Sequence, residues 1–230
     1  MPTERELKVG CFIHVLQCHC SLKIFIAITG SIFAISFLAF PLSGGSWEWD
    51  LNNALGFLAL AGLLYLTVPF RGVRNLWLHE HFSYAVLGIV LIHAFWFLTV
   101  DGAALQYIRI GAPAYMWAGI VSVFFLGLSV WFATLPARQH VYGGYTSFRY
   151  WHRLFAIIAI AGATYHIVQS GFYLHTWYQS VFFIAIVVIV TFNRSLKTGI
   201  VAAVPARPRT FLLVGTFASI IFALLRNSTQ

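Results

Sequence analysis

The sequence predicts an all-α protein: a polytopic transmembrane bundle of six core helices with a further hydrophobic helix at its C-terminal end. Of the 230 residues, 60% are hydrophobic and 9% are charged, whereas soluble domains carry about 25% charged residues. The apolar residues gather in runs of roughly 16–22 residues, and about 20 helical residues cross a bilayer core. The segments between these runs are shorter than a folded domain of about 50 residues.

The runs follow one another with short connections and divide the chain into three parts. We expect a cytoplasmic N-terminal segment over residues 1–23, a six-helix domain over residues 24–193, and a cytoplasmic loop plus the last hydrophobic helix over residues 194–230. The expected spans cover residues 24–40, 54–70, 79–100, 114–135, 149–169, 177–192 and 210–225. The last run is also short enough to form a helix that lies in the membrane interface.

The distribution of basic residues predicts the orientation of the bundle. With the N-terminus inside, only Arg109 and Arg226 of the 14 Lys and Arg residues fall in outer segments. This asymmetry follows the positive-inside rule and predicts a plasma membrane protein (the inner membrane of a bacterium) with a cytoplasmic N-terminus. The net charge of +8 is then explained by topology and by contact with anionic membrane lipid. It does not indicate nucleic-acid binding, which needs a soluble basic surface.

Three cysteines, Cys11, Cys18 and Cys20, lie in the expected inner segment together with His14 and His19. In a reducing compartment we expect free thiols rather than disulfides. Thiolate and imidazole are soft ligands for zinc or copper, but this spacing matches no common zinc module.

Four histidines in two expected spans are the most informative polar residues. His79 and His93 are 14 residues apart, as are His152 and His166. Fourteen helical residues turn by about 1400° and rise by about 21 Å, so both side chains of each pair lie within about 40° of one face. Because the two spans run in the same direction, the four residues predict two histidine pairs stacked across the bilayer. Neutral imidazole ligates haem iron, so each pair is a candidate site for haem b.

Two alternatives to this interpretation stay open. His81 competes with His79 as the inner ligand, although it lies about 120° away from the face that His93 occupies; we favour His79. The four histidines are also compatible with a structural network of polar side chains or with protonatable groups in a transporter.

The residues around these histidines resemble the ferric reductase-like transmembrane domain. The family includes ferric-chelate reductases, the membrane half of NADPH oxidases and the haem-binding membrane subunit of bacterial methionine sulfoxide reductase systems. The likeness covers residues 50–193. The similar stretches are Trp77-Leu78-His79 with His93-Ala94, Phe148-Arg149-Tyr150-Trp151-His152-Arg153-Leu154-Phe155 with His166, and Leu55-Gly56-x-x-Ala59-x-x-Gly62 closing at Pro69-Phe70-Arg71-Gly72.

The resemblance implies two b-type haems, an inner one held by His79 and His152 and an outer one held by His93 and His166. It also implies basic residues beside the propionates of the inner haem, which charge-assisted pairing would hold. The local candidates are Arg71, Arg74, Arg149 and Arg153. Positive-inside topology alone explains these arginines equally well.

Two glycines shortly before the outer histidines, Gly88 and Gly162, are expected to let a porphyrin approach the backbone, or to let two helices pack closely.

The chain departs from the larger members of this family after the sixth span. Those proteins continue into a cytosolic module that binds flavin and NADPH, whereas residues 194–230 contain no glycine-rich dinucleotide fingerprint. We therefore expect no flavin or nicotinamide site in this chain. The electron donor is then a separate flavoprotein reductase or membrane quinol.

The sequence thus favours an oxidoreductase component that moves electrons across the membrane, from the inner donor to an outer acceptor such as an extracytoplasmic oxidoreductase. No side chain is expected to act as a general acid or a nucleophile. One alternative is a self-contained ferric or oxygen reductase fed by a soluble flavoprotein. The other is a haem-free transporter or assembly factor that uses intramembrane histidines.

Overall fold

The computed structural model describes residues 23–36, 46–68, 73–100, 109–135, 143–192 and 207–227, and in these ranges helices are joined only by turns and bends. The first helical stretch is Lys23–Ser36. The helices that follow are α2 (Trp47–Leu66), α3 (Val73–Val100), α4 (Ala114–Thr134), α6 (Tyr145–Ser170), α7 (Trp177–Phe192) and α9 (Pro208–Asn227). Each overlaps one expected span, so the all-α prediction is confirmed for this part of the chain. The cysteine-containing N-terminal segment lies outside the described residues.

Four helices, α3, α4, α6 and α9, are long and apolar enough to cross a membrane. The structure therefore does not reproduce the predicted count of six core spans plus one. The stretch Lys23–Ser36 and α7 are apolar but shorter, and the first turns of α2 contain Glu48 and Asp50 together with two asparagines. Polar side chains at the start of α2 shorten its apolar portion.

Local signals in the sequence set several helix ends. Ser46 caps α2, because its Oγ accepts a hydrogen bond from the Trp49 N–H at 3.3 Å. Gly171, with φ of 66°, ends α6 in the left-handed conformation that glycine adopts without strain. Thr176 directly precedes α7, and Gln179 lies in the first turn of that helix. Gln179 Oε1 accepts from the Thr176 N–H at 3.0 Å, in the manner of a capping box.

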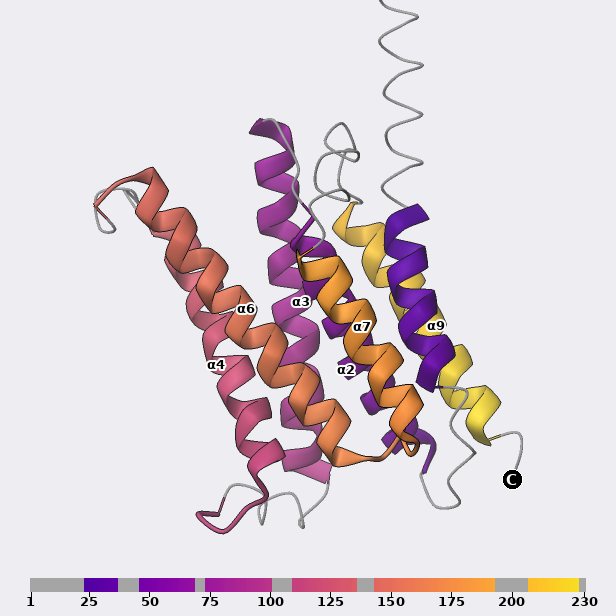
Figure 1. The fold of residues 1–230 in the computed structure, drawn as a ribbon. Helices are drawn as coiled ribbons and strands as arrows, with labels where there is room; N and C mark the ends of the chain where they lie inside the picture. Colours follow the sequence, from indigo (N-terminus) through magenta and orange to yellow (C-terminus); the bar gives the residue numbers. More distant parts are fainter. Residues whose placement is uncertain are drawn as a thin grey trace, which may run out of the picture.

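The helices lie side by side, with α4 along α6 on one flank and α9 beside the stretch Lys23–Ser36 on the other (Figure 1). Between the flanks, α2 contacts α3, α6, α7 and α9. The interior is rich in aromatic rings, such as Phe25 of the first stretch, which packs edge-on against Tyr65 of α2, Phe82 of α3 and Phe211 of α9. A single set of contacts thus joins elements from both ends of the chain.

The last hydrophobic helix belongs to this core. Gly215 of α9 lies so close to Leu58 of α2 that a Cβ at Gly215 would come within 2.4 Å of Leu58 Cδ2. Phe211 and Phe222 of α9 are fully buried. Small residues at a helix crossing allow this close approach, so α9 packs directly on α2.

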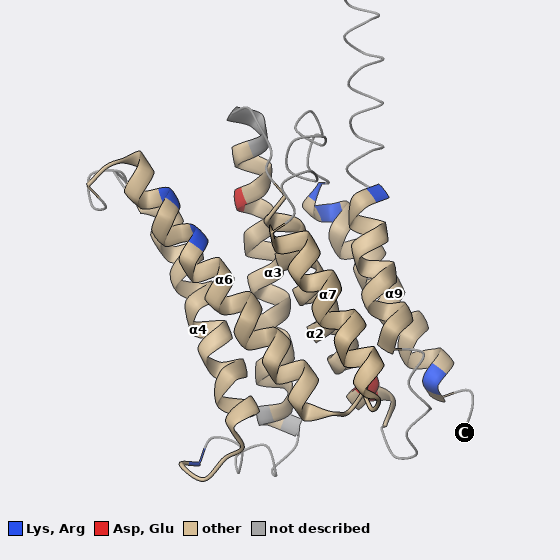
Figure 2. Ribbon diagram, viewed as in Figure 1, with Lys and Arg blue, Asp and Glu red and all other residues tan. Residues whose placement is uncertain are grey.

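Basic residues gather at the end of the bundle where α6 and α9 begin, here termed the basic end (Figure 2). They are Lys23, Arg149, Arg153, Arg207 and Arg209. Because α3 and α6 both start at this end, His79 and His152 lie nearer to it than His93 and His166 do.

Candidate functional site

The structure brings the four predicted histidines together as two pairs between α3 and α6. At the basic end, the imidazole centroids of His79 and His152 are 6.3 Å apart, with an angle of 61° between the ring planes. Further along the same helices, His93 and His166 line one cavity. The pairing that the 14-residue spacing predicts is therefore the pairing that the helices make.

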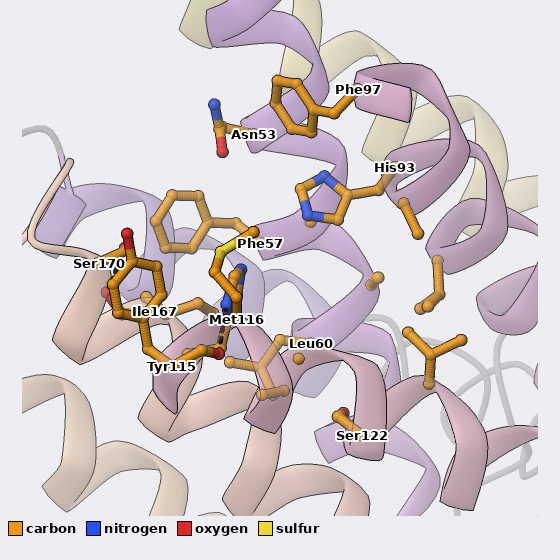
Figure 3. A pocket seen from close by; sticks show the side chains of 18 of the residues that line it. Asn53, Phe57, Leu60, His93, Phe97, Tyr115, Met116, Ser122, Ile167 and Ser170 are labelled. Atoms are coloured by element: carbon orange, nitrogen blue, oxygen red, sulfur yellow. Dashed lines mark hydrogen bonds between the residues drawn. The ribbon is translucent and has the colours of Figure 1, made fainter. Parts of the chain in front are cut away.

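The cavity between His93 and His166 has a volume of about 270 Å³ and is walled mainly by apolar side chains. It is bounded by α2, α3, α4 and α6 and by the loop that precedes α7. In Figure 3 the His93 ring projects from α3 toward the space that Phe57, Leu60 and Met116 border. An apolar cavity lined by a small number of polar side chains is the usual form of a small-molecule or cofactor site.

Backbone carbonyl groups fix both imidazoles in this cavity. His93 Nδ1 donates to the Asn52 carbonyl oxygen at 2.8 Å, and His166 Nδ1 donates to the Tyr115 carbonyl oxygen at 2.9 Å. Since a carbonyl oxygen can only accept, each Nδ1 carries a proton, and in the neutral imidazole each Nε2 then keeps its lone pair. The Asn52 side chain also donates to the His93 carbonyl oxygen at 3.1 Å, which ties α2 to α3.

Two glycines make room for these rings. A Cβ at Gly56 would lie 2.9 Å from His93 Cε1, and a Cβ at Gly119 would lie 3.1 Å from His166 Nδ1. The two glycines that the sequence analysis expected to admit a porphyrin, Gly88 and Gly162, do not lie against these rings. Gly162 faces the Ala118 carbonyl oxygen, 2.8 Å from an ideal Cβ, and so serves the packing of α6 on α4, whereas Gly88 has nothing within 4 Å of an ideal Cβ.

At the basic end, a side chain orients His152 instead. Ser129 Oγ of α4 lies 3.0 Å from His152 Nδ1, and the ring of Phe148 stacks against the His152 imidazole at 5.7 Å. Sequence reasoning did not identify Ser129. The available signal was the occurrence of Ser122 and Ser129 two turns apart in an otherwise apolar helix.

His81 does not join the pair. Its Nδ1 lies 2.9 Å from the Trp77 carbonyl oxygen, one turn earlier in α3, and its ring packs on the Trp77 indole at 3.9 Å. His79, which faces α6, is therefore the better placed of the two histidines.

Three of the four candidate arginines lie in the described part of the chain. Arg149 and Arg153 are exposed near the start of α6, and the Arg149 guanidinium lies 5.6 Å from the Tyr145 ring centroid. Arg74 is part of α3, whereas Arg71 lies outside the described residues. Among the residues that the structure describes, no three His, Cys, Asp or Glu side chains group in a way that could hold a metal ion by themselves.

A buried polar cluster lies behind the part of the cavity wall that Tyr173 forms. Tyr173, which lines the cavity, donates its hydroxyl hydrogen to Asp50 Oδ1 at 2.8 Å. Asp50 also accepts hydrogen bonds from Arg226 Nε at 3.2 Å and Asn227 Nδ2 at 3.1 Å. Burial, reinforced by the Asp50 carboxylate, raises the pKa of Tyr173 above its ordinary range. The cluster thus connects the loop before α7 to α2 and α9.

Together the fold and the site define a helical integral membrane protein with two histidine pairs between α3 and α6. Comparisons with known proteins find no matching family model, curated protein or solved structure.

Proposed function

We propose that this chain is an electron-transfer subunit of a membrane oxidoreductase and holds two b-type haems. His79 and His152 would ligate the inner haem, and His93 and His166 would ligate the outer one. The observation that carries the proposal is the convergence of four histidines, spaced 14 apart on two helices, into two cross-helix pairs.

The separation of the inner rings supports shared ligation. Imidazole nitrogen lies about 2.0–2.1 Å from a bound transition-metal ion, so two imidazoles on opposite sides of one ion have nitrogens about 4 Å apart and ring centres about 6 Å apart. The centroids of His79 and His152 are 6.3 Å apart. His79 and His152 would thus both be able to hold the iron of one haem.

The outer pair supports the proposal through its protonation and its surroundings. Both rings donate from Nδ1, and in the neutral imidazole this leaves Nε2 unprotonated, which is the form that ligates a metal. The hydrogen bond from each Nδ1 fixes the ring orientation and increases its basicity. The apolar cavity and the space left by Gly56 and Gly119 suit a flat, hydrophobic macrocycle.

Haem iron, when bound, supplies one-electron chemistry whose potential the surrounding protein tunes. This chain's own residues would hold the iron, fix the imidazole tautomers and keep water from the apolar interior. Arg149 and Arg153, exposed at the basic end that bears His152, are available to pair with propionates, as Arg71 and Arg74 are by position in the sequence.

The proposal includes a membrane orientation. The helices that cross the bilayer include α3, α4, α6 and α9, and the basic end faces the cytoplasm of a bacterial cell, as the positive-inside rule directs. A soluble flavoprotein or quinol then donates electrons at the basic end, and the acceptor lies on the other side.

The test is spectroscopic. We expect the purified protein, expressed with ample haem, to show the absorption of low-spin b haem and to contain two haems per chain. His93→Leu and His152→Leu should each remove one haem, while His175→Leu, a change in the loop before α7, should remove none. Absence of haem from the wild-type protein would overturn the proposal and favour a haem-free transporter. Retention of both haems by His93→Leu would refute the ligand assignment.

A further inference from the structure

Two buried serines of α4 reach across to α6 in different ways. Ser122 and Ser129 are seven residues apart, which places them on one face of the helix two turns apart. They are only 8% and 4% exposed, respectively. Ser122 Oγ donates to the Ala159 carbonyl oxygen at 2.7 Å, whereas Ser129 Oγ lies 3.0 Å from His152 Nδ1. The first contact ties two helices together, and the second acts on an imidazole.

The contact of Ser129 differs from its counterparts at the outer pair. There the partners of Nδ1 are backbone carbonyl oxygens of Asn52 and Tyr115, which no side-chain substitution removes. At His152 the partner is a hydroxyl, which can accept from Nδ1–H or donate to a bare Nδ1. Only the accepting arrangement leaves the Nε2 lone pair available to a metal.

We propose that Ser129 is the positioning residue of the inner site: it accepts the Nδ1 proton of His152 and holds the tautomer whose Nε2 can ligate haem iron. This inference rests on the proposed function. The hydrogen bond that Ser129 accepts would set the basicity of one haem ligand, and therefore the reduction potential of the inner haem, through a single side chain. The outer ligands, which backbone groups orient, have no such point of control.

The physical reason is the effect of a hydrogen bond on a metal-bound imidazole. An acceptor at Nδ1–H orients the ring and increases its donation to the metal, and loss of such partners costs about 10–100-fold in metal affinity or activity. Without Ser129, the His152 ring loses the hydroxyl that accepts from Nδ1–H, and it binds ferric iron less strongly. The inner haem should then be easier to reduce.

The experiment uses the full chain in a His93→Leu background, which leaves the inner haem alone. In Ser129→Ala we expect haem retention to fall about tenfold, and a redox titration should shift to higher potential. Ser129→Thr, which keeps the hydroxyl, should restore both values. Ser122→Ala removes a hydroxyl from the same helix face and should leave the potential unchanged.

A readout that needs no haem guards against variants that fold poorly. Nitrogen NMR of the histidine rings should show His152 protonated at Nδ1 in the wild-type protein and a mixture of tautomers in Ser129→Cys, whose thiol is a weaker acceptor. If the Ser129 and Ser122 variants have the same potential at the inner haem and the same His152 tautomer, the inference is overturned and the proposed function is left intact. Absence of haem from the wild-type chain would instead overturn the proposed function.

Discussion

Arg226 Nε lies 3.2 Å from Asp50 Oδ1, in an ion pair between residues 176 positions apart in the sequence. Both side chains are almost fully buried, at 7% and 5% exposure. The Arg226 guanidinium also lies 4.7 Å from the Tyr173 ring centroid and 5.7 Å from that of Phe222. The pair therefore fastens the end of α9 to the start of α2, beside the wall of the outer cavity.

Removing one partner of this pair should destabilise the protein strongly. Arg226→Met leaves the Asp50 carboxylate buried without its cation, and an uncompensated buried charge costs about 3–5 kcal/mol. We expect a clearly lower melting temperature in detergent solution. The double variant Asp50→Asn with Arg226→Met should recover much of the loss, since neither charge remains. Arg209→Met, an exposed position of the same helix, is the control. Equal melting temperatures for the Arg226 and Arg209 variants would contradict the prediction.

The Tyr173 hydroxyl should make the stability sensitive to alkaline pH. Because burial and the Asp50 carboxylate raise its pKa in the folded state, the unfolded chain loses this proton first as the pH rises. The stabilisation is therefore complete below the unfolded pKa of about 10 and is lost progressively above it. In thermal denaturation series from about pH 9 to pH 11, wild type should lose more stability than Tyr173→Phe. Substituting the exposed Tyr178 by Phe should leave the wild-type slope, and parallel slopes for all three proteins would rule out this role of Tyr173.

Enlarging the glycine beside His93 should weaken the outer site selectively. The Gly56→Ala methyl would lie 2.9 Å from Cε1 of a ring that its bond to Asn52 holds in place. Overpacking of this kind costs about 1–3 kcal/mol, and about 1.4 kcal/mol is a tenfold change in binding. We expect the haem content to fall from two per chain toward one, with the inner haem retained. Gly127→Ala, at a position with nothing within 4 Å of an ideal Cβ, should keep both haems. Full haem content in Gly56→Ala would show that the cavity does not confine His93.

The two neighbouring histidines of α3 should respond differently to the same substitution. His79→Leu should remove the inner haem, because the His79 ring faces His152 at 6.3 Å between centroids. His81→Leu should retain two haems, because that ring is engaged by Trp77 of its own helix. Haem quantification with the reduced absorption spectrum distinguishes the two variants. Loss of haem in His81→Leu alone would reverse the assignment of the inner ligand.

Several features of the fold could be predicted because they depend on short stretches of chain. Apolar runs determine where helices form, and the described helices overlap the expected spans. Helical periodicity places His79 with His93, and His152 with His166, on shared faces. The number of spans was less predictable, because Lys23–Ser36 and α7 form shorter helices and polar side chains at the start of α2 shorten its apolar portion.

The partners of the histidines could not be predicted in the same way. The oxygen atoms that meet His93, His166 and His152 come from α2 and from two places in α4. The clearances at Gly56 and Gly119 likewise depend on how closely neighbouring helices approach. None of these residues stands at a fixed distance in sequence from the ring that it contacts.

The sequence by itself determined the helical class, the positions of the apolar helices, the charge asymmetry and the position of each histidine along its helix, because each follows from composition or from the period of a single helix. Only the tertiary structure decided which oxygen orients each imidazole, which glycines leave room beside it, and that Asp50 meets Arg226. Periodicity specifies the face of a helix on which a residue lies, but the neighbour of that face is settled by packing among all helices at once.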